Sequence, residues 1–467
     1  MHDLKEIVVA GVTMVAALTL AAETVIEIDE SGVVGPIKPM HAVNNGPSGE
    51  KSDQANDNFD DYAALHPPYA RTHDAARTHA YGGHHIIDIS YVFPDFSKDE
   101  NDPKSYDFTC TDYYLENMIK AGTEPYYRLG QSIEHWIKKY DTGVPPDFGK
   151  YARICEHIIR HYTEGWADGY RWKITYWEFG NEPDLGNKMW QGTKEQFCEL
   201  FVIVISHLKQ QFPHLKIGGP SLASSGSWVE ATVEALKAKS VPLDFYSWHA
   251  YTTEARWMFG MGDRIRGVLD KNGYEKTESH MNEWNYVDGC FSRAKWKYSL
   301  EVDAGRHIDK GAAFCADTMN RCQASRSVDM AMYYDARVEY RMNGMFDHLT
   351  LDPMKPYYAF YGWDKLYRLG QSLAATVADD QGQYAATAAA DSEGKRHALM
   401  LSRYNNDNNV VDEQWVTIRL KGGKSLANAR IHLTDAIRTY TEVPGVRTAA
   451  GEIKLRMKPQ SFALIEW

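Results

Sequence analysis

The sequence predicts an α/β protein, a (β/α)8 TIM barrel with an accessory β-sandwich domain built from both chain ends. Two observations predict it. Strand-like and helix-like segments alternate over residues 36–365, and eight of these segments have the features of strands. After Leu369 the alternation gives way to short apolar runs bounded by Gly, Asn, Asp and Pro. The expected domains are a catalytic barrel, residues 36–365, and a β-sandwich, residues 1–35 together with residues 366–467.

The eight predicted barrel strands are short and mostly apolar, as expected of parallel strands covered by helices. In chain order they are Pro39–Val43, Tyr69–His73, Glu124–Leu129, Thr175–Phe179, Lys216–Gly219, Asp244–His249, Glu278–Glu283 and Met330–Asp335. An open doubly wound sheet is the rival architecture. It usually has a glycine-rich phosphate-binding turn after an early strand, and this chain has none, which favours the barrel.

Two segments between these strands show the helical repeat clearly. One has an apolar stripe made of Tyr151, Ile154, Cys155, Ile158, Ile159 and Tyr162. The other follows the fourth strand and has a stripe made of Phe197, Leu200, Phe201, Val204 and Leu208. It is preceded by Thr193-Lys194-Glu195-Gln196, a pattern typical of a capping box at a helix start.

The predicted sandwich strands are short runs of the C-terminal region, which the N-terminal run Val25–Ile28 is expected to join. The C-terminal runs are His397–Ser402, Val416–Leu420, Ala429–Leu433, Glu452–Arg456 and Ser461–Ile465.

Composition excludes several functions. The formal net charge is −12 and no basic run is present, so no nucleic-acid partner is expected. The cysteines form no CxxC pair, which gives no support for a zinc or redox site, and no cofactor is expected. Several of them lie in helix-like segments as small apolar groups, which favours a reducing compartment and a cytoplasmic location. No feature indicates an oligomeric state.

The N-terminus offers an alternative location. Residues 7–22 form an uncharged, mostly apolar run with the length of a signal-peptide core, but the residues before it carry more acid than base. We expect strands of the accessory domain here. Secretion or export to the periplasm is the alternative, if residues 1–22 act as an atypical signal peptide. The run is short for a membrane span, and no membrane partner is expected.

Two strand ends each deliver a glutamate beside an asparagine. The fourth strand ends in Gly180-Asn181-Glu182-Pro183, and the seventh in Asn282-Glu283-Trp284-Asn285. Catalytic groups of such barrels lie at the carboxyl ends of the strands. Two carboxyl groups ~5 Å apart are the minimum needed to hydrolyse a glycosidic bond with retention. We expect Glu182 to be the acid/base and Glu283 the nucleophile, acting on a carbohydrate.

These motifs resemble those of glycoside hydrolase family 39 in clan A of the retaining glycosidases, the family of β-xylosidases and α-L-iduronidases. The segments that carry the resemblance are Ala70–His73, Tyr176–Pro183, Ser247–Tyr251, Asn282–Asn285, Asn343–Phe346 and Pro356–Phe360. The resemblance covers nearly the whole chain and implies a barrel with a β-sandwich built from both chain ends. Two departures bear on the substrate. Gly180 stands where the family commonly has tryptophan, and Tyr333-Tyr334-Asp335 stands where a tryptophan usually lies under the sugar.

Supporting roles follow from residue chemistry and agree with the resemblance. Arg71 is expected to hold the pKa of the nucleophile low, although a structural salt bridge is the alternative. The other candidates would orient sugar hydroxyl groups, contact the nucleophile or offer a flat face to the sugar. They are Asn45, His73, Asp74, Asn181, His249, Tyr251, Trp284 and Tyr334.

The leading hypothesis is a retaining exo-acting glycosidase on plant-type glycans, most similar to a β-xylosidase, with an α-L-arabinofuranosidase or another glycosidase of the family as the alternative. A non-catalytic sugar-binding barrel is a hypothesis from another class. A metal-dependent hydrolase would use His73, His79, His84 and His85, but their spacing does not match a helical metal motif, and no metal site is expected. Arg77 and Arg128 leave a uronic-acid substrate as a minority alternative.

Overall fold

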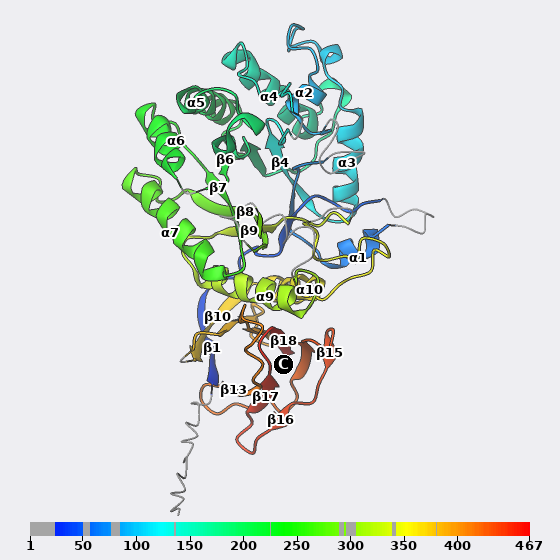
Figure 1. Cartoon of the computed structure of the whole chain (residues 1–467), viewed down its shortest axis with the longest axis vertical. Helices are drawn as coiled ribbons and strands as arrows, with labels where there is room; N and C mark the ends of the chain where they lie inside the picture. The colour runs from blue at the N-terminus through cyan, green and yellow to red at the C-terminus, as the bar shows by residue number, and fades with distance from the viewer. Residues whose placement is uncertain are drawn as a thin grey trace, which may run out of the picture.

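The computed structural model describes residues 24–49, 57–75, 85–134, 137–224, 226–288, 294–295, 305–338, 342–379 and 381–467. Figure 1 shows a barrel surrounded by helices and, below it, a smaller β part, with α9 (Asp309–Ala324) and α10 (Tyr357–Leu369) between the two. The predicted fold class is confirmed. The apolar run 7–22 and the predicted roles of residues 1–22 lie outside the described residues.

The barrel is closed by eight parallel strands, and each coincides with one of the predicted strands. They are β2 (Ala42–Asn44), β3 (Tyr69–Arg71), β4 (Glu124–Leu129), β5 (Tyr176–Phe179), β6 (Lys216–Leu222), β7 (Phe245–Thr252), β8 (Glu278–Tyr286) and β9 (Met330–Tyr333). Pairing of β9 with β2 closes the ring. Strands β7 and β8 continue three residues beyond the predicted ends, so they extend the barrel at its C-terminal rim.

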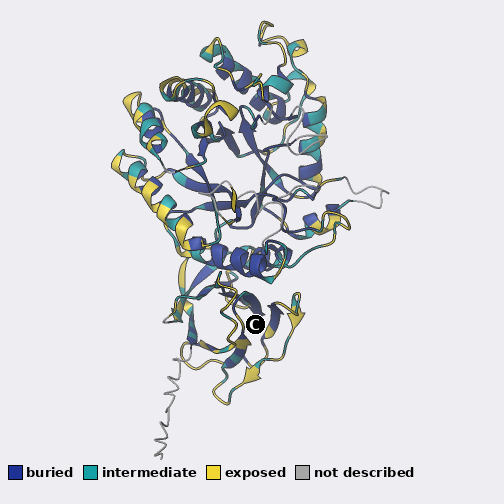
Figure 2. Ribbon diagram, in the orientation of Figure 1, coloured by how far each residue is buried: buried dark blue, intermediate teal, exposed yellow. Residues whose placement is uncertain are grey.

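The remaining described helices surround the barrel. They are α1 (Phe59–Ala64), α2 (Ile89–Val92), α3 (Thr109–Lys120), α4 (Phe148–Thr163), α5 (Lys194–Gln211), α6 (Ser227–Ala238) and α7 (Ala255–Lys271), with 3-10 turns η1 (Pro103–Ser105), η2 (Trp166–Asp168) and η3 (Pro183–Lys188). The helices turn buried faces to the strands and exposed faces outward (Figure 2). None of the helices in the described part of the chain is long and apolar enough to cross a membrane.

Both predicted amphipathic helices are confirmed. The whole stripe predicted on α4 is buried. At the start of α5 the Thr193 hydroxyl accepts a hydrogen bond from the Gln196 amide at 3.2 Å, and the Gln196 side chain accepts one from the Thr193 amide at 2.9 Å. These reciprocal bonds satisfy two amide groups that a helix start otherwise leaves without partners.

The second part is one mixed sheet of ten strands that curls into a sandwich. In sheet order its strands are β15 (Thr441–Glu442), β14 (Arg430–Thr434), β18 (Ser461–Glu466), β12 (His397–Arg403), β11 (Tyr384–Ala390), β10 (Gln371–Ala378), β1 (Thr24–Pro36), β13 (Gln414–Leu420), β17 (Ile453–Met457) and β16 (Val446–Arg447). Ile431 of β14 and Ile453 of β17 belong to the same apolar core although their strands lie far apart in the sheet. The two arms of the sheet therefore face each other.

An aromatic cluster fills the N-terminal end of the barrel. Tyr126, Tyr176, Phe245 and His280 pack there, with Tyr126 and Tyr176 stacked at 5.4 Å between ring centroids and Phe245 and His280 at 4.8 Å. This packing fills the N-terminal end of the barrel, and the catalytic groups of such barrels lie at the opposite, C-terminal rim.

Candidate active site

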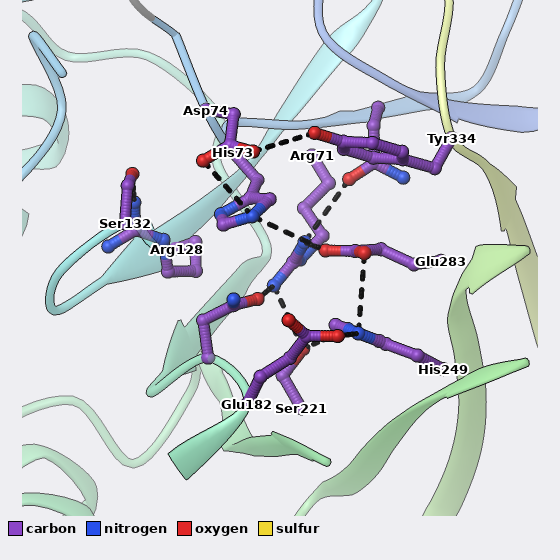
Figure 3. A network of polar contacts seen from close by, with 12 residues as sticks. Arg71, His73, Asp74, Arg128, Ser132, Glu182, Ser221, His249, Glu283 and Tyr334 are labelled. Carbon is purple, nitrogen blue, oxygen red and sulfur yellow. Dashed lines mark hydrogen bonds and ion pairs between the residues drawn. The ribbon is translucent and has the colours of Figure 1, made fainter. Parts of the chain in front are cut away.

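A tight turn at the end of β5 presents Glu182 at the C-terminal rim. Gly180 has φ = +98° and donates its amide to the Leu129 carbonyl of β4 at 3.0 Å. Glu182 itself has φ = +44°, and its amide donates to the Ser221 carbonyl of β6 at 2.8 Å. Pro183 then begins η3. The turn is thus fixed to both neighbouring strands, and it holds the Glu182 side chain beside His249 (Figure 3).

Glu283 reaches the same place because β8 changes register. Trp248 of β7 pairs with Met281, but His249, the next residue, pairs with Glu283. The extra residue, Asn282, breaks the strict alternation of side chains. Asn282 and Glu283 therefore both point into the barrel, where Asn282 donates to the buried carboxylate of Glu178.

The two predicted catalytic carboxyl groups meet across His249. The Nδ1 atom of His249 lies 2.8 Å from Glu182 Oε1 and 3.3 Å from Glu283 Oε2. One oxygen of each glutamate and a nitrogen of His249 all lie within 4.8 Å of one another. Retaining glycosidases have carboxyl groups about 5–5.5 Å apart, whereas inverting ones leave about 6.5–9.5 Å for a water molecule. The separation of Glu182 and Glu283 fits that of retaining glycosidases.

Arg71, at the end of β3, is the centre of the polar network, and all five of its N–H groups have partners. They donate to Glu178 Oε2 (2.6 Å), Glu283 Oε1 (2.7 Å), Asn44 Oδ1 (3.2 Å), Asn181 Oδ1 (2.8 Å) and Ser221 Oγ (2.9 Å). Burial opposes the charge of this guanidinium, but Glu178 and Glu283 raise its pKa above the ordinary value. The predicted contact of Arg71 with Glu283 is present, but the expected low pKa of Glu283 was wrong, because burial outweighs the charge of Arg71 and raises that pKa to about 7.

His249 and Tyr251 also contact Glu283, as their positions at the end of the sixth barrel strand suggested. The Tyr251 hydroxyl donates to Glu283 Oε2 at 2.6 Å. Burial lowers the pKa of His249 to about 4, so this imidazole is neutral near pH 7. Its Nε2 atom lies 2.6 Å from the Ser221 hydroxyl, so Nδ1 is free to face the two carboxyl groups.

His73, Asp74 and Tyr334 form a second layer beside Glu283. His73 Nε2 lies 3.5 Å from Glu283 Oε1 and 3.4 Å from Asp74 Oδ1. The Tyr334 hydroxyl donates to Asp74 Oδ2 at 2.7 Å. Tyr334 therefore belongs to the site through Asp74.

Two predicted site residues are not available to a sugar. Trp284 is 0% exposed and packs against Phe314, Tyr333 and Phe360, outside the barrel lumen. The prediction of a sugar platform was wrong because neighbouring strand residues face opposite sides and Glu283 takes the inner one. Asn45 already has protein partners for both of its side-chain groups: its oxygen accepts from the Tyr114 hydroxyl at 2.7 Å and its amide nitrogen donates to Asp335 at 3.3 Å.

Sequence reasoning missed four residues of the network: Asn44, Glu178, Ser221 and Asn282. Glu178 left a signal, because it lies two residues after Tyr176 on β5 and must face the barrel interior with it. A charged residue inside a barrel needs a partner, and Arg71 was the candidate. Ser221 gave no signal, since its place depends on a φ of +61° just after β6 bends.

The environments of the two glutamates differ in the way their assigned roles require. Burial, followed by the charges of Asp184 and Asp74, raises the pKa of Glu182 to about 8. Burial also raises the pKa of Glu283, to about 7, but His249, Arg71 and the Tyr251 hydroxyl favour its ionised form. Glu283 is therefore the first of the pair to ionise, and Glu182 is the one that keeps its proton.

The raised pKa of Glu182 predicts a pH-dependent gain in stability for Glu182→Gln. The folded-state pKa is about 8, against an ordinary 4.5. The wild-type fold therefore loses stability relative to the variant as the pH rises from about 4.5 to about 8. We expect the variant to be more stable at pH 8.5 by about 4–5 kcal/mol, since each pKa unit corresponds to about 1.4 kcal/mol, and within about 1 kcal/mol of the wild type at pH 5. Urea unfolding at the two pH values measures this, and equal differences at both would contradict the raised pKa.

The histidine cluster is only partly described. His73 and His85 lie near Asp74, with His85 Nδ1 3.9 Å from Asp74 Oδ1, whereas His79 and His84 lie outside the described residues. Among the described residues, the group with metal-ligand spacing is Glu182, His249 and Glu283, the carboxylate pair itself.

A cavity of about 270 Å³ adjoins the site next to Gly180. Its lining includes Gly130, Gly180, Asn181, Trp190 and Phe197. A Cβ atom at Gly180 would lie 3.2 Å from the Phe197 ring and 3.1 Å from the Pro220 carbonyl. This hollow therefore borders Gly180, the position at which the resemblance led us to expect a tryptophan.

A closed (β/α)8 barrel with paired glutamates at the ends of its fourth and seventh strands defines the class of barrel glycoside hydrolases. The chain belongs to glycosyl hydrolases family 39, whose family model matches residues 70–438. It is 26% identical over 163 residues to a β-xylosidase of Geobacillus stearothermophilus, an alignment that covers 32% of this chain and only 31% of that relative.

Solved structures share the fold across both parts. A glucosidase from Croceicoccus marinus superposes with a TM-score of 0.75 at 22% identity, covering 95% of this chain and 98% of that one. An α-L-arabinofuranosidase from Thermotoga maritima superposes with a TM-score of 0.66 at 13% identity, covering 95% and 99%. At these identities the likeness concerns the fold alone.

Proposed function

We propose that the protein is a retaining, exo-acting glycoside hydrolase of the β-xylosidase type, with Glu182 as acid/base and Glu283 as nucleophile. The observation that supports this most is the approach of the two carboxyl groups, within 4.8 Å of each other on one rim. That spacing supports a retaining mechanism, in which the second carboxylate itself attacks the sugar, over an inverting one, which needs room for a water molecule.

In the first step Glu283 attacks the anomeric carbon while Glu182 gives its proton to the departing glycosidic oxygen. The bond from carbon to the leaving oxygen breaks, a glycosyl ester of Glu283 forms, and Glu182 becomes a carboxylate. The positive charge of Arg71, 2.7 Å from Glu283, favours the ionised form of the nucleophile and partly offsets the burial that raises its pKa.

In the second step Glu182 acts as a base. It removes a proton from water, the hydroxide attacks the anomeric carbon, and the ester bond to Glu283 breaks. Two inversions give net retention. His249 is placed to donate from Nδ1 to either carboxylate, 2.8 Å from Glu182 and 3.3 Å from Glu283, and so assists both steps.

The relatives support the choice of first substrate. The aligned Geobacillus stearothermophilus relative is a β-xylosidase, which favours a β-xyloside. An α-L-arabinofuranoside is the second candidate, since an α-L-arabinofuranosidase shares the fold over nearly the whole chain. Action on chain ends and on plant-type glycans is part of the proposal.

A panel of aryl β-xylosides, α-L-arabinofuranosides and β-glucosides tests the proposed function, with proton NMR of the first sugar released. We expect phenol release and a first product that keeps the anomeric configuration of the substrate. A first product of opposite configuration would exclude the double displacement. Binding without release would favour a sugar-binding barrel, and loss of activity with EDTA would favour metal-dependent hydrolysis.

The pH dependence of turnover should have two limbs of known origin. Activity should fall below about pH 7, where Glu283 takes up a proton, and above about pH 8, where Glu182 loses its own. In Glu182→Ala the alkaline limb should disappear on dinitrophenyl glycosides, which need no acid, and azide should restore the slow second step. An alkaline limb unchanged in this variant would show that another group is the acid.

A further inference from the structure

Beside the catalytic pair lies a group of buried polar atoms that no described residue hydrogen-bonds. They are Arg128 Nε and Nη1, His73 Nδ1, His85 Nδ1, Asp74 Oδ1 and Asn181 Nδ2. Each of these side chains belongs to a residue at most 7% exposed. A buried donor or acceptor without a partner costs about 1–3 kcal/mol. So many unpartnered atoms next to Glu283, which is itself only 3% exposed, indicate that a bound ligand supplies the missing hydrogen-bond partners.

Arg128 is the strongest donor of this group. It lies on β4, and its Nη2 atom donates to Asp88 Oδ1 and to Ser132 Oγ, each at 2.6 Å. Asp88 also accepts from the amide and the hydroxyl of Ser132, both at 2.8 Å. Figure 3 shows His73 between Arg128 and Glu283. One edge of the guanidinium is therefore held in place, while Nε and Nη1 keep their donors for another group.

The charges around Arg128 favour a neutral ligand over an acidic one. Arg128 already has Asp88 as its ion-pair partner, Arg71 has Glu178 and Glu283, and Arg337 has Asp335 at 2.8 Å. A sugar carboxylate would enter as an additional buried anion next to Asp74 and Glu283, which is costly. A hydroxyl group both donates and accepts, and so matches a set that contains the acceptor Asp74 Oδ1 among its donors.

We propose that Arg128, together with Asp74, forms the part of the site that selects a neutral sugar by binding its hydroxyl groups. This rests on the proposed function and concerns the same site, but it names Arg128 as a specificity-determining residue and excludes uronic acids as the preferred substrate.

Arg128→Lys is the test, because lysine keeps a charge for Asp88 but lacks the planar set of donors. Arg403→Lys is the matched control. Arg403 is equally buried in the β-sandwich, where it pairs with Asp412 at 2.8 Å, far along the chain from the site. Two readouts are used: kcat/KM on neutral aryl glycosides and on aryl β-glucuronide, and the shift of Tm caused by xylose, arabinose, glucose or glucuronic acid.

In the wild-type protein we expect a neutral sugar, and not glucuronic acid, to raise Tm. In Arg128→Lys that shift should vanish, and kcat/KM on the neutral glycoside should fall about 10- to 100-fold, the loss of one or two hydrogen bonds to a charged group. Arg403→Lys should keep both the wild-type Tm shift and the wild-type kcat/KM. A Tm of Arg128→Lys without sugar close to that of Arg403→Lys would show that folding is intact.

Three results would overturn the proposal: Arg128→Lys within twofold of wild type in both readouts, glucuronic acid as the preferred ligand, or no Tm shift with any sugar. An Arg128→Lys variant that behaves like wild type would mean that ordered water, and not a sugar, forms the hydrogen bonds to these atoms. A Glu283→Gln variant run in parallel separates this failure from failure of the proposed function. If that variant stops turnover while Arg128→Lys has no effect, only the role of Arg128 is wrong.

Discussion

Replacing Glu283 with Gln is expected to reduce kcat on every aryl glycoside that the protein cleaves by about 10⁴-fold or more, because in the proposed mechanism the Glu283 carboxylate forms the glycosyl ester. The amide of glutamine is almost isosteric with the carboxylate: its oxygen can still accept from Arg71, and its NH2 group can donate to the Tyr251 hydroxyl oxygen, at the two positions that Glu283 contacts at 2.6–2.7 Å. The loss should therefore be chemical and not structural. Steady-state kinetics together with the unfolding temperature measures it.

Glu278→Gln is the matched control for this experiment. Glu278 lies on the same strand as Glu283, at the opposite end, where it pairs with Lys216. The Glu278→Gln substitution should leave kcat within a few-fold of the wild-type value. With Glu283→Ala, azide takes the place of the nucleophile and should give a glycosyl azide of inverted configuration. Turnover in Glu283→Gln comparable with that of Glu278→Gln would remove Glu283 from the mechanism.

Replacing Arg71 with Met should cost both activity and stability. The substitution leaves the carboxylates of Glu178 and Glu283 buried without the cation that holds them at 2.6 and 2.7 Å. Breaking a buried ion pair by removing one partner costs about 3–5 kcal/mol. The pKa of Glu283 should rise further, since Arg71 is one of the groups that lower it, and the acidic limb of the pH–rate profile should move upward.

Arg71→Lys and a surface pair provide the comparison for this effect. Lysine restores one positive charge but cannot replace five donors in a plane, so we expect partial recovery of stability and little recovery of kcat. Arg264→Ala breaks an exposed pair with Glu230 at 2.8 Å and should cost less than about 1 kcal/mol. If Arg71→Met unfolds at the same urea concentration as Arg264→Ala, the buried network does not stabilise the fold as described.

The barrel was predictable because its signals are local. Each strand is a short apolar run between amphipathic segments, and α4 and α5 show their stripes without reference to the rest of the chain. The sandwich was predicted less completely. Strand β11 is the alanine-rich run Tyr384–Ala390, which has little intrinsic preference for a strand. It is a strand because it pairs with β12 along its whole length, a contact that local pattern does not reveal.

The site residues were likewise predictable where their signals are local and missed where they depend on distant contacts. Glu182, Glu283, Arg71, His249 and Tyr251 were predicted from motifs at strand ends, and the structure brings all five together. Trp284 was misplaced because the register shift at Asn282, which decides what faces the barrel, depends on the pairing of β7 with β8. Ser221 and Glu178 were missed because their roles depend on Arg71, which reaches them from a distant strand.

The most direct measurement is to trap the intermediate. A 2-deoxy-2-fluoro-β-xyloside with a dinitrophenyl leaving group forms the glycosyl ester quickly and hydrolyses it slowly, and mass spectrometry of a protein digest locates the sugar. We expect one sugar per chain, attached to the peptide that contains Glu283, and no labelling of Glu283→Gln. A sugar attached to Glu182 or to any other residue would contradict the assignment of the nucleophile.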